Sequence, residues 1–217
     1  MANVRTKSVK TWGQLQQSIA PMLPGEPERI PWTWYDTQTY VSTTTTVLNF
    51  FQTVQADQVL GNMQASGQIP SPMYFDLHHL GIFFNLRPSG VTDATAIAAI
   101  QIGTLDDIQQ LLLGTVQLEI AQKRYYEGKI WQCPAGGGAY GGVSATGSSA
   151  ATSIDVVEWA CNGVPDLRNR NNFWGDLTLP HNQNFLVRLN WTAGLTIQST
   201  PITIVIALDG YLYRRVL

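Results

Sequence analysis

Two runs of alternating side chains near the end of the 217-residue sequence constrain the fold most strongly. Between residues 185 and 191 every second side chain is apolar, which is the period of a strand with one buried face. Between residues 202 and 208 the alternate positions hold isoleucine or leucine, and Gly210 then interrupts the run. We expect both segments to be strands inside a sheet. The pattern therefore predicts a closed antiparallel β architecture.

Earlier segments have a similar character, with β-branched or alternating apolar residues between turn-rich stretches. Residues 39–53 predict one or two strands, and residues 73–86 predict another with a bulge or break at Gly81. Further strands are expected at residues 115–120, 124–133 and 154–161. About eight strands result, which is the content of an all-β, two-sheet antiparallel sandwich or single jelly roll.

The N-terminal residues differ from the rest of the chain. Behind Thr11, residues 12–22 have the spacing of a short amphipathic helix, and prolines end it. The next residues, up to Glu28, predict a turn or linker because of their Pro and Gly content. We therefore expect an N-terminal arm with a short helix at residues 1–30 and a jelly-roll domain at residues 31–217.

Three segments inside the predicted domain depart from the strand pattern. Residues 93–100 and 105–113 each follow a threonine and have helical spacing, so we expect two short helices inserted between strands. Residues 134–153 are rich in Gly, Ala and Ser and carry no charge. This composition predicts a long flexible loop or an extended arm.

Charge is scarce in this sequence. Charged residues make up 13% of it, about half the fraction in an average globular protein. A surface built from uncharged polar side chains loses little on desolvation, which favours a subunit that covers much of itself with neighbours. The formal net charge of -2 argues against a dedicated nucleic-acid binder, because such proteins carry a basic stripe.

One local group of positive charges stands out. Arg5, Lys7 and Lys10 lie within the first ten residues, which hold no acidic residue. A basic arm of this kind can contact genome phosphate or lipid headgroups without reading a nucleic-acid sequence. The simpler alternative is a frayed N-terminus.

Targeting and redox signals point to the cytoplasm. No apolar stretch approaches the ~20 residues that a membrane-spanning helix needs. The first residues lack the apolar core of a signal peptide, so we expect the protein to be made in a cytoplasm. Cys133 and Cys161 are the only cysteines, and two distant thiols fit reduced cysteines better than a disulfide framework.

Motifs for chemistry are weak throughout. The Gly-rich residues 135–142 lack the Lys-Ser/Thr pair of a phosphate-binding loop. On a regular strand Asp76 and His78 would share one face while His79 faces the other, so the strand offers at most two metal ligands, and His181 is the only other histidine. No Gly-x-Ser-x-Gly nucleophile motif is present. We therefore assign no catalytic, metal-binding or cofactor-binding residue.

Paired carboxylates could hydrolyse sugars, but their usual role at a sheet rim is to be solvated or hydrogen-bonded. The acids in or near expected strands are Asp36, Asp76, Glu119, Glu127, Asp155 and Glu158.

Aromatic residues are the best candidates for contacts with other molecules. Trp32, Trp34 and Tyr35 form a tight cluster, and Tyr140 is the one large residue of the Gly-rich segment. We identify these four as possible subunit contacts. Tryptophans spread through the strands could alternatively line a sugar-binding face, although such residues more often form a sandwich core or anchor an interface.

Three segments near the end of the sequence form a distinctive succession: residues 175–180 (GDLTLP), 183–191 (QNFLVRLNW) and 202–213, the last with Leu-Asp-Gly at 208–210. This succession resembles the end of jelly-roll capsid proteins of tailless bacterial viruses. Residues 114–125 and 131–137 look like the same kind of protein. The likeness covers about half of the chain.

This resemblance implies a building block of an icosahedral and possibly lipid-containing virion, without catalysis or a cofactor. Its partners would be copies of itself, grouped as trimers or pseudo-hexameric capsomers, and other virion proteins. The N-terminal arm would contact the genome or an internal membrane. A double jelly roll usually needs a longer chain, so a single jelly roll is the better expectation.

Two other functions remain open from the residues alone. The first is a carbohydrate-binding or receptor-binding β-sandwich, as in the head of a spike or fibre, with exposed aromatic side chains that stack on sugar. The second is a cupin-like metal enzyme that uses residues 76–79.

Overall fold

The computed structural model describes residues 27–85, 104–133, 137–146, 155–163, 171–197 and 202–215. Almost all regular structure in these segments is β. In chain order the elements are β1 (Pro27–Tyr40), β2 (Val47–Phe50), β3 (Tyr74–Asn85), α3 (Thr104–Leu112), β4 (Thr115–Ile120), β5 (Lys123–Lys129), the 3-10 helix η1 (Ile130–Gln132), β6 (Gly137–Thr146), β7 (Asp155–Gly163), β8 (Asn171–Leu179), β9 (Phe185–Asn190) and β10 (Ile202–Arg215).

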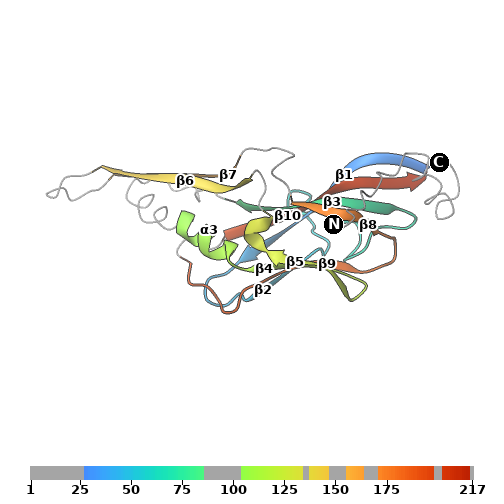
Figure 1. Cartoon of the computed structure of the whole chain (residues 1–217), viewed down its shortest axis with the longest axis horizontal. Helices are drawn as coiled ribbons and strands as arrows, with labels where there is room; N and C mark the ends of the chain where they lie inside the picture. Colours follow the sequence, from blue (N-terminus) through green and yellow to red (C-terminus); the bar gives the residue numbers. More distant parts are fainter. Residues whose placement is uncertain are drawn as a thin grey trace, which may run out of the picture.

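Eight of these strands form two four-stranded antiparallel sheets. Sheet A has the order β1-β10-β3-β8, and sheet B has the order β2-β9-β4-β5. Figure 1 shows the sheets as two layers. With β6 and β7 set aside, the first strand pairs with the last, the second with the last but one, the third with β8, and β4 with β5. This nested pairing is a jelly roll, and the predicted two-sheet β-sandwich is confirmed.

The core lies between the two sheets. In β9 the buried residues are Phe185, Val187 and Leu189, and every second residue of β4 is buried as well. The isoleucines of β10 face the same core from sheet A. The alternating apolar residues of these strands therefore form the inner face of each sheet, as predicted, because successive side chains of a strand point to opposite sides.

Helix α3 packs against this core beside β4. Its Ile108 and Leu111 are fully buried. The indole nitrogen of Trp191 donates a hydrogen bond of 3.0 Å to the Leu111 carbonyl, and the Trp191 ring lies edge-on to Tyr40 at 4.9 Å. The predicted helix at residues 105–113 is thus confirmed, whereas the helices predicted at residues 12–22 and 93–100 lie outside the described residues.

A bulge in β3 falls at His78 and not at Gly81 as predicted. Asp209 pairs with His79 and Gly210 pairs with Leu77, so His78 is an extra residue with no partner on β10, while Gly81 pairs regularly with Ala207. A bulge shifts the alternation by one residue. The core-facing residues of β3 accordingly change from Phe75 and Leu77 before the bulge to Leu80, Ile82 and Phe84 after it.

Two predicted boundaries also need correction. Strand β1 begins at Pro27, and its first residues pair with the end of β10, so residues 27–30 belong to the sandwich and not to the N-terminal arm. Residues 137–146 of the predicted flexible loop 134–153 form β6, which pairs with β7. Residues 134–136 and 147–153 lie outside the described part of the chain. In that described part, the helices are too short or too polar to cross a membrane.

Candidate functional site

The β6–β7 hairpin is the most distinctive feature of this jelly roll. It is inserted between β5 and β8 and pairs from Gly137 opposite Gly163 to Thr146 opposite Asp155. Beyond its own ladder, its main described contact is between β6 and α3. Figure 1 shows the hairpin extending away from the two sheets. A two-stranded hairpin is marginally stable on its own in water, so this one gains from a further surface to pack on.

Exposed apolar residues lie at the root of the hairpin, which we define as Leu113, Trp131 and their neighbours in α3 and η1. Leu113 is 68% exposed and Trp131 is 55% exposed. A hydrogen bond of 3.1 Å from the Ile130 amide to the Gly114 carbonyl links the two segments. Exposed apolar residues that lie together can form part of a contact surface. The hairpin and its root form the first candidate interface.

A second group of exposed apolar residues lies in the loop between β2 and β3. The exposed fractions are 44% for Val54, 80% for Val59 and 42% for Leu60. Asn62 ties this loop to β1, because its side-chain oxygen accepts a hydrogen bond of 2.9 Å from the Tyr35 amide. The loop therefore presents apolar side chains from a fixed position beside the first strand of sheet A.

The predicted contact residues have separate environments. Trp32 is 37% exposed and remains available. Trp34 is 1% exposed and belongs to the core, so the prediction that it contacts another subunit is wrong. Tyr35 is half-buried, and its hydroxyl donates a hydrogen bond of 2.5 Å to the Gln58 carbonyl. Tyr140 lies on β6, opposite Cys161.

The predicted basic arm of Arg5, Lys7 and Lys10 lies outside the described residues. Its proposed contact with the genome or a membrane therefore stays a prediction.

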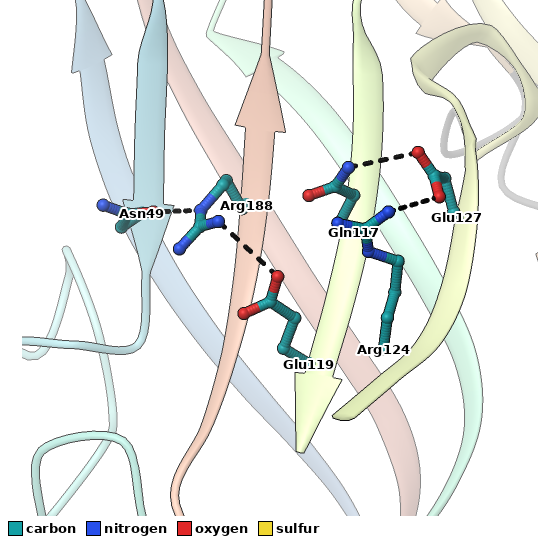
Figure 2. Close-up of polar contacts among 6 residues, drawn as sticks. All are labelled: Asn49, Gln117, Glu119, Arg124, Glu127 and Arg188. Carbon is teal, nitrogen blue, oxygen red and sulfur yellow. Dashed lines mark hydrogen bonds and ion pairs between the residues drawn. The ribbon is translucent and has the colours of Figure 1, made fainter. Parts of the chain in front are cut away.

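The outer face of sheet B carries paired polar side chains across all four strands (Figure 2). Arg188 lies between Asn49 and Glu119, with a hydrogen bond of 3.0 Å to the Asn49 oxygen and an ion pair of 3.5 Å with Glu119. An ion pair that remains partly open to water contributes little to stability. Such a pair is costly to desolvate, however, so this part of sheet B is better suited to water than to a dry interface.

The same face continues onto β5. Glu127 accepts hydrogen bonds of 2.7 Å from Arg124 and 3.1 Å from Gln117 (Figure 2). These two bonds, first that from Arg124, hold the pKa of Glu127 below its usual value. The glutamate is therefore ionised at neutral pH and paired within the subunit.

The histidine region does not form the predicted arrangement. The core residues Phe75 and Leu77 flank Asp76, and the core residue Leu80 follows His79, so Asp76 and His79 both face outward from sheet A and the prediction that they face opposite sides is wrong. His78, the bulge residue, is exposed. Its ring contacts Tyr211 edge-on at 5.2 Å, while Asp76 accepts a hydrogen bond of 2.6 Å from Thr178. His181 lies against Tyr74 instead. Within the described ranges, no group of three His, Cys, Asp or Glu side chains could hold a metal ion.

Cys133 is a free, fully buried thiol. Burial raises its pKa to about 11. The side-chain nitrogen of Asn171 lies 3.2 Å from its sulfur, and the Tyr126 hydroxyl lies 3.3 Å away. Burial and the neighbouring sulfur likewise raise the pKa of Tyr126. Cys133 is thus protonated at neutral pH, which suits a packing role and not that of a nucleophile.

Comparison of the chain with protein-family models, curated proteins and solved structures gives no match. The resemblance to capsid proteins therefore rests on the sequence features described above.

Sequence reasoning missed the hairpin because glycine weakens the strand pattern of β6. One available signal was the apolar strand predicted at residues 154–161, which needed a partner strand.

Proposed function

We propose that this protein is a structural subunit of a virus of bacteria that assembles with copies of itself into an icosahedral shell. It performs no catalysis and works in the virion, as part of trimers or pseudo-hexameric capsomers together with other virion proteins. The observation that carries this proposal is the combination of a jelly-roll sandwich with an inserted hairpin that extends from it. Jelly rolls are common in viral capsids, although lectins and cupins share the architecture.

The distribution of side chains supports assembly through particular faces. Sheet B presents paired charges, which favour contact with water. Exposed apolar residues instead gather at the hairpin root and in the loop between β2 and β3. A subunit that binds neighbours through its edges and ends, and leaves a sheet face to solvent, would show this distribution.

The cupin-like alternative has little support in this fold. A metal site on a jelly roll needs imidazoles and a carboxylate that converge from adjacent strands. Among the described residues no three His, Cys, Asp or Glu side chains converge in this way, and the Asp76 carboxylate accepts a hydrogen bond from Thr178.

Assembly is tested directly by multi-angle light scattering over a range of protein concentrations, with negative-stain microscopy of the same samples. The proposal predicts oligomers of capsomer size or closed particles. A monomer whose mass does not change with concentration or with salt would refute it. Microscopy of particles from the native source, with the copy number of this protein per particle, would separate a capsid subunit from a minor virion protein.

A further inference from the structure

The outer face of sheet A holds a pocket of about 540 Å³, open on one side, beside the bulge in β3. Its walls include Trp32, Thr33, Asn62, His78, Asp209 and Tyr211. This volume lies in the range of small-molecule sites, about 300–1,000 Å³. All of these residues come from one chain.

The strand register explains why polar residues meet on this face. Thr33 pairs with Asp209, and Asp209 pairs with His79, so the three lie side by side across β1, β10 and β3. The residues next to them, Trp34, Leu208 and Leu80, are buried in the core. Because side chains alternate along a strand, Thr33, Asp209 and His79 point to the outer face.

The bulge adds a further ring to this pocket. His78 is the extra residue, and its exposed ring lies against Tyr211. The bulge also depends on Gly210, since a Cβ atom there would overlap the backbone oxygen of Asp76. Bulges commonly redirect a side chain at functional sites, and here the bulge places an imidazole at the pocket wall.

Two aromatic rings of the pocket are held by neighbouring side chains. The Arg29 guanidinium lies 3.4 Å from the centre of the Tyr211 ring, and His78 contacts the same ring edge-on. Rings held in this way lose little conformational entropy when they contact a ligand.

The polar walls are also fixed. The Thr33 hydroxyl donates a hydrogen bond of 2.5 Å to the Asp209 carboxylate. Asn62 is held by two backbone contacts, one with the Tyr35 amide at 2.9 Å and one with the Thr33 carbonyl at 2.7 Å. Preorganised polar groups beside aromatic rings are the usual construction of a small-molecule site.

The side chains that line the pocket indicate which class of ligand it can bind. Asp209 is the only carboxylate among the lining residues, and Arg29, which is not among them, already stacks on the Tyr211 ring. An imidazole offers a hydrogen-bond donor, and hydroxyl and carboxylate groups add acceptors. Hydroxyl-rich ligands match such a set, and their apolar ring faces can pack on aromatic side chains.

We propose that this pocket binds a neutral saccharide. The site lies on sheet A, away from the charged face of sheet B and separate from the hairpin. It adds ligand recognition to the assembly role and does not depend on it, because a single chain supplies every wall.

The test uses the full chain and saturation-transfer NMR with maltose, cellobiose, lactose and di-N-acetylchitobiose as probes, followed by calorimetric titration of any sugar that responds. We expect saturable binding of at least one neutral disaccharide. His78→Ala and Asp209→Asn should each weaken it about ten-fold or more, which is the effect of losing one good contact. Tyr125→Ala, which removes an exposed aromatic ring on β5 of sheet B, should leave it unchanged.

Three results would overturn this assignment. They are no saturable response to any of the four sugars, equal binding by His78→Ala, Asp209→Asn and the parent protein, or tighter binding of the anionic probe 3′-sialyllactose than of lactose. Circular dichroism of each variant shows whether it is folded, and Asp209→Asn keeps the side-chain shape should His78→Ala disturb the bulge. Light scattering of the same variants distinguishes this result from the assembly proposal, because failure of either one leaves the other measurable.

Discussion

The Asp36 carboxylate accepts a hydrogen bond of 2.6 Å from the backbone amide of Phe51. Asp36 is 1% exposed and also accepts hydrogen bonds of 2.9 Å from the Thr37 amide and the Gln55 side chain. A buried carboxylate is tolerated when several donors surround it. This acid therefore fixes the segment after β2 against β1, beside the loop that carries the exposed valines.

Replacement of Asp36 by asparagine should destabilise the subunit by about 2–3 kcal/mol, because the new amide group would face the donors that the carboxylate now satisfies. Urea unfolding followed by fluorescence measures the change. Asp57→Asn is the matched control, since Asp57 is exposed and its carboxylate accepts a local hydrogen bond from the Val59 amide. A loss below about 0.5 kcal/mol for Asp36→Asn, in the range of ordinary surface substitutions, would contradict this role.

Ala121→Gly should stabilise the protein by about 0.5–1 kcal/mol. Ala121 and Gln122 connect β4 to β5 with φ values of 48° and 67°, a left-handed conformation that costs residues with a Cβ atom about 1–2 kcal/mol. Glycine removes most of that strain but adds freedom to the unfolded chain. The midpoint of thermal unfolding should rise. The same change at the exposed Ala193, whose φ is not positive, should lower it or leave it unchanged.

We expect the buried thiol of Cys133 to make the folded protein less stable at alkaline pH. Its folded-state pKa is about 11, against 9 for an ordinary thiol. The folded protein therefore holds this proton more tightly than the unfolded chain does. The resulting stabilisation is complete below about pH 9 and disappears as the pH rises through about 11. Near pH 10 the loss should be about 1 kcal/mol.

Urea unfolding at pH 8 and about pH 10 measures this change for the parent protein and for Cys133→Ala. The difference in free energy of unfolding between the two proteins should shrink at the higher pH by about 1 kcal/mol, because alanine has no proton to lose. A difference that stays constant with pH would show that burial does not hold the thiol in its neutral form.

The hairpin root should affect assembly more than folding. Leu113→Ser and Trp131→Ser remove exposed apolar side chains, so each should change the free energy of unfolding by less than about 0.5 kcal/mol. In light scattering, both should shift the oligomer towards smaller species at a given concentration. Val41→Ser is the control, because Val41 is also exposed but lies in the turn between β1 and β2. Equal effects of all three variants would show that the hairpin root has no special role in assembly.

The sheets could be predicted where one face of each strand is buried. In β4, β9 and β10 the apolar residues alternate because a single face meets the core. Helix α3 could be predicted for a similar reason, because its apolar spacing and the threonine at its start are local signals of a helix. Fold class and most strand positions followed from such patterns.

The pairing of strands could not be read in this way. The bulge at His78 depends on how β3 meets β10, where Gly210 lies close to the Asp76 backbone. The hairpin was missed because the glycines of β6 weaken its strand pattern, and it becomes a strand through its ladder with β7. Trp34 looked like a contact residue, but β1 turns that side chain into the core.

The alternating strands near the end of the sequence by themselves determined that this is a two-sheet β protein, because burial of one face imposes a period of two along any strand. Only the tertiary structure decided which strands became neighbours, where β3 has its bulge, and which polar side chains lie together on an outer face. Those outcomes depend on contacts between residues far apart in the chain. Local sequence patterns do not contain this information. The pocket on sheet A and the projecting hairpin both arise from such long-range contacts.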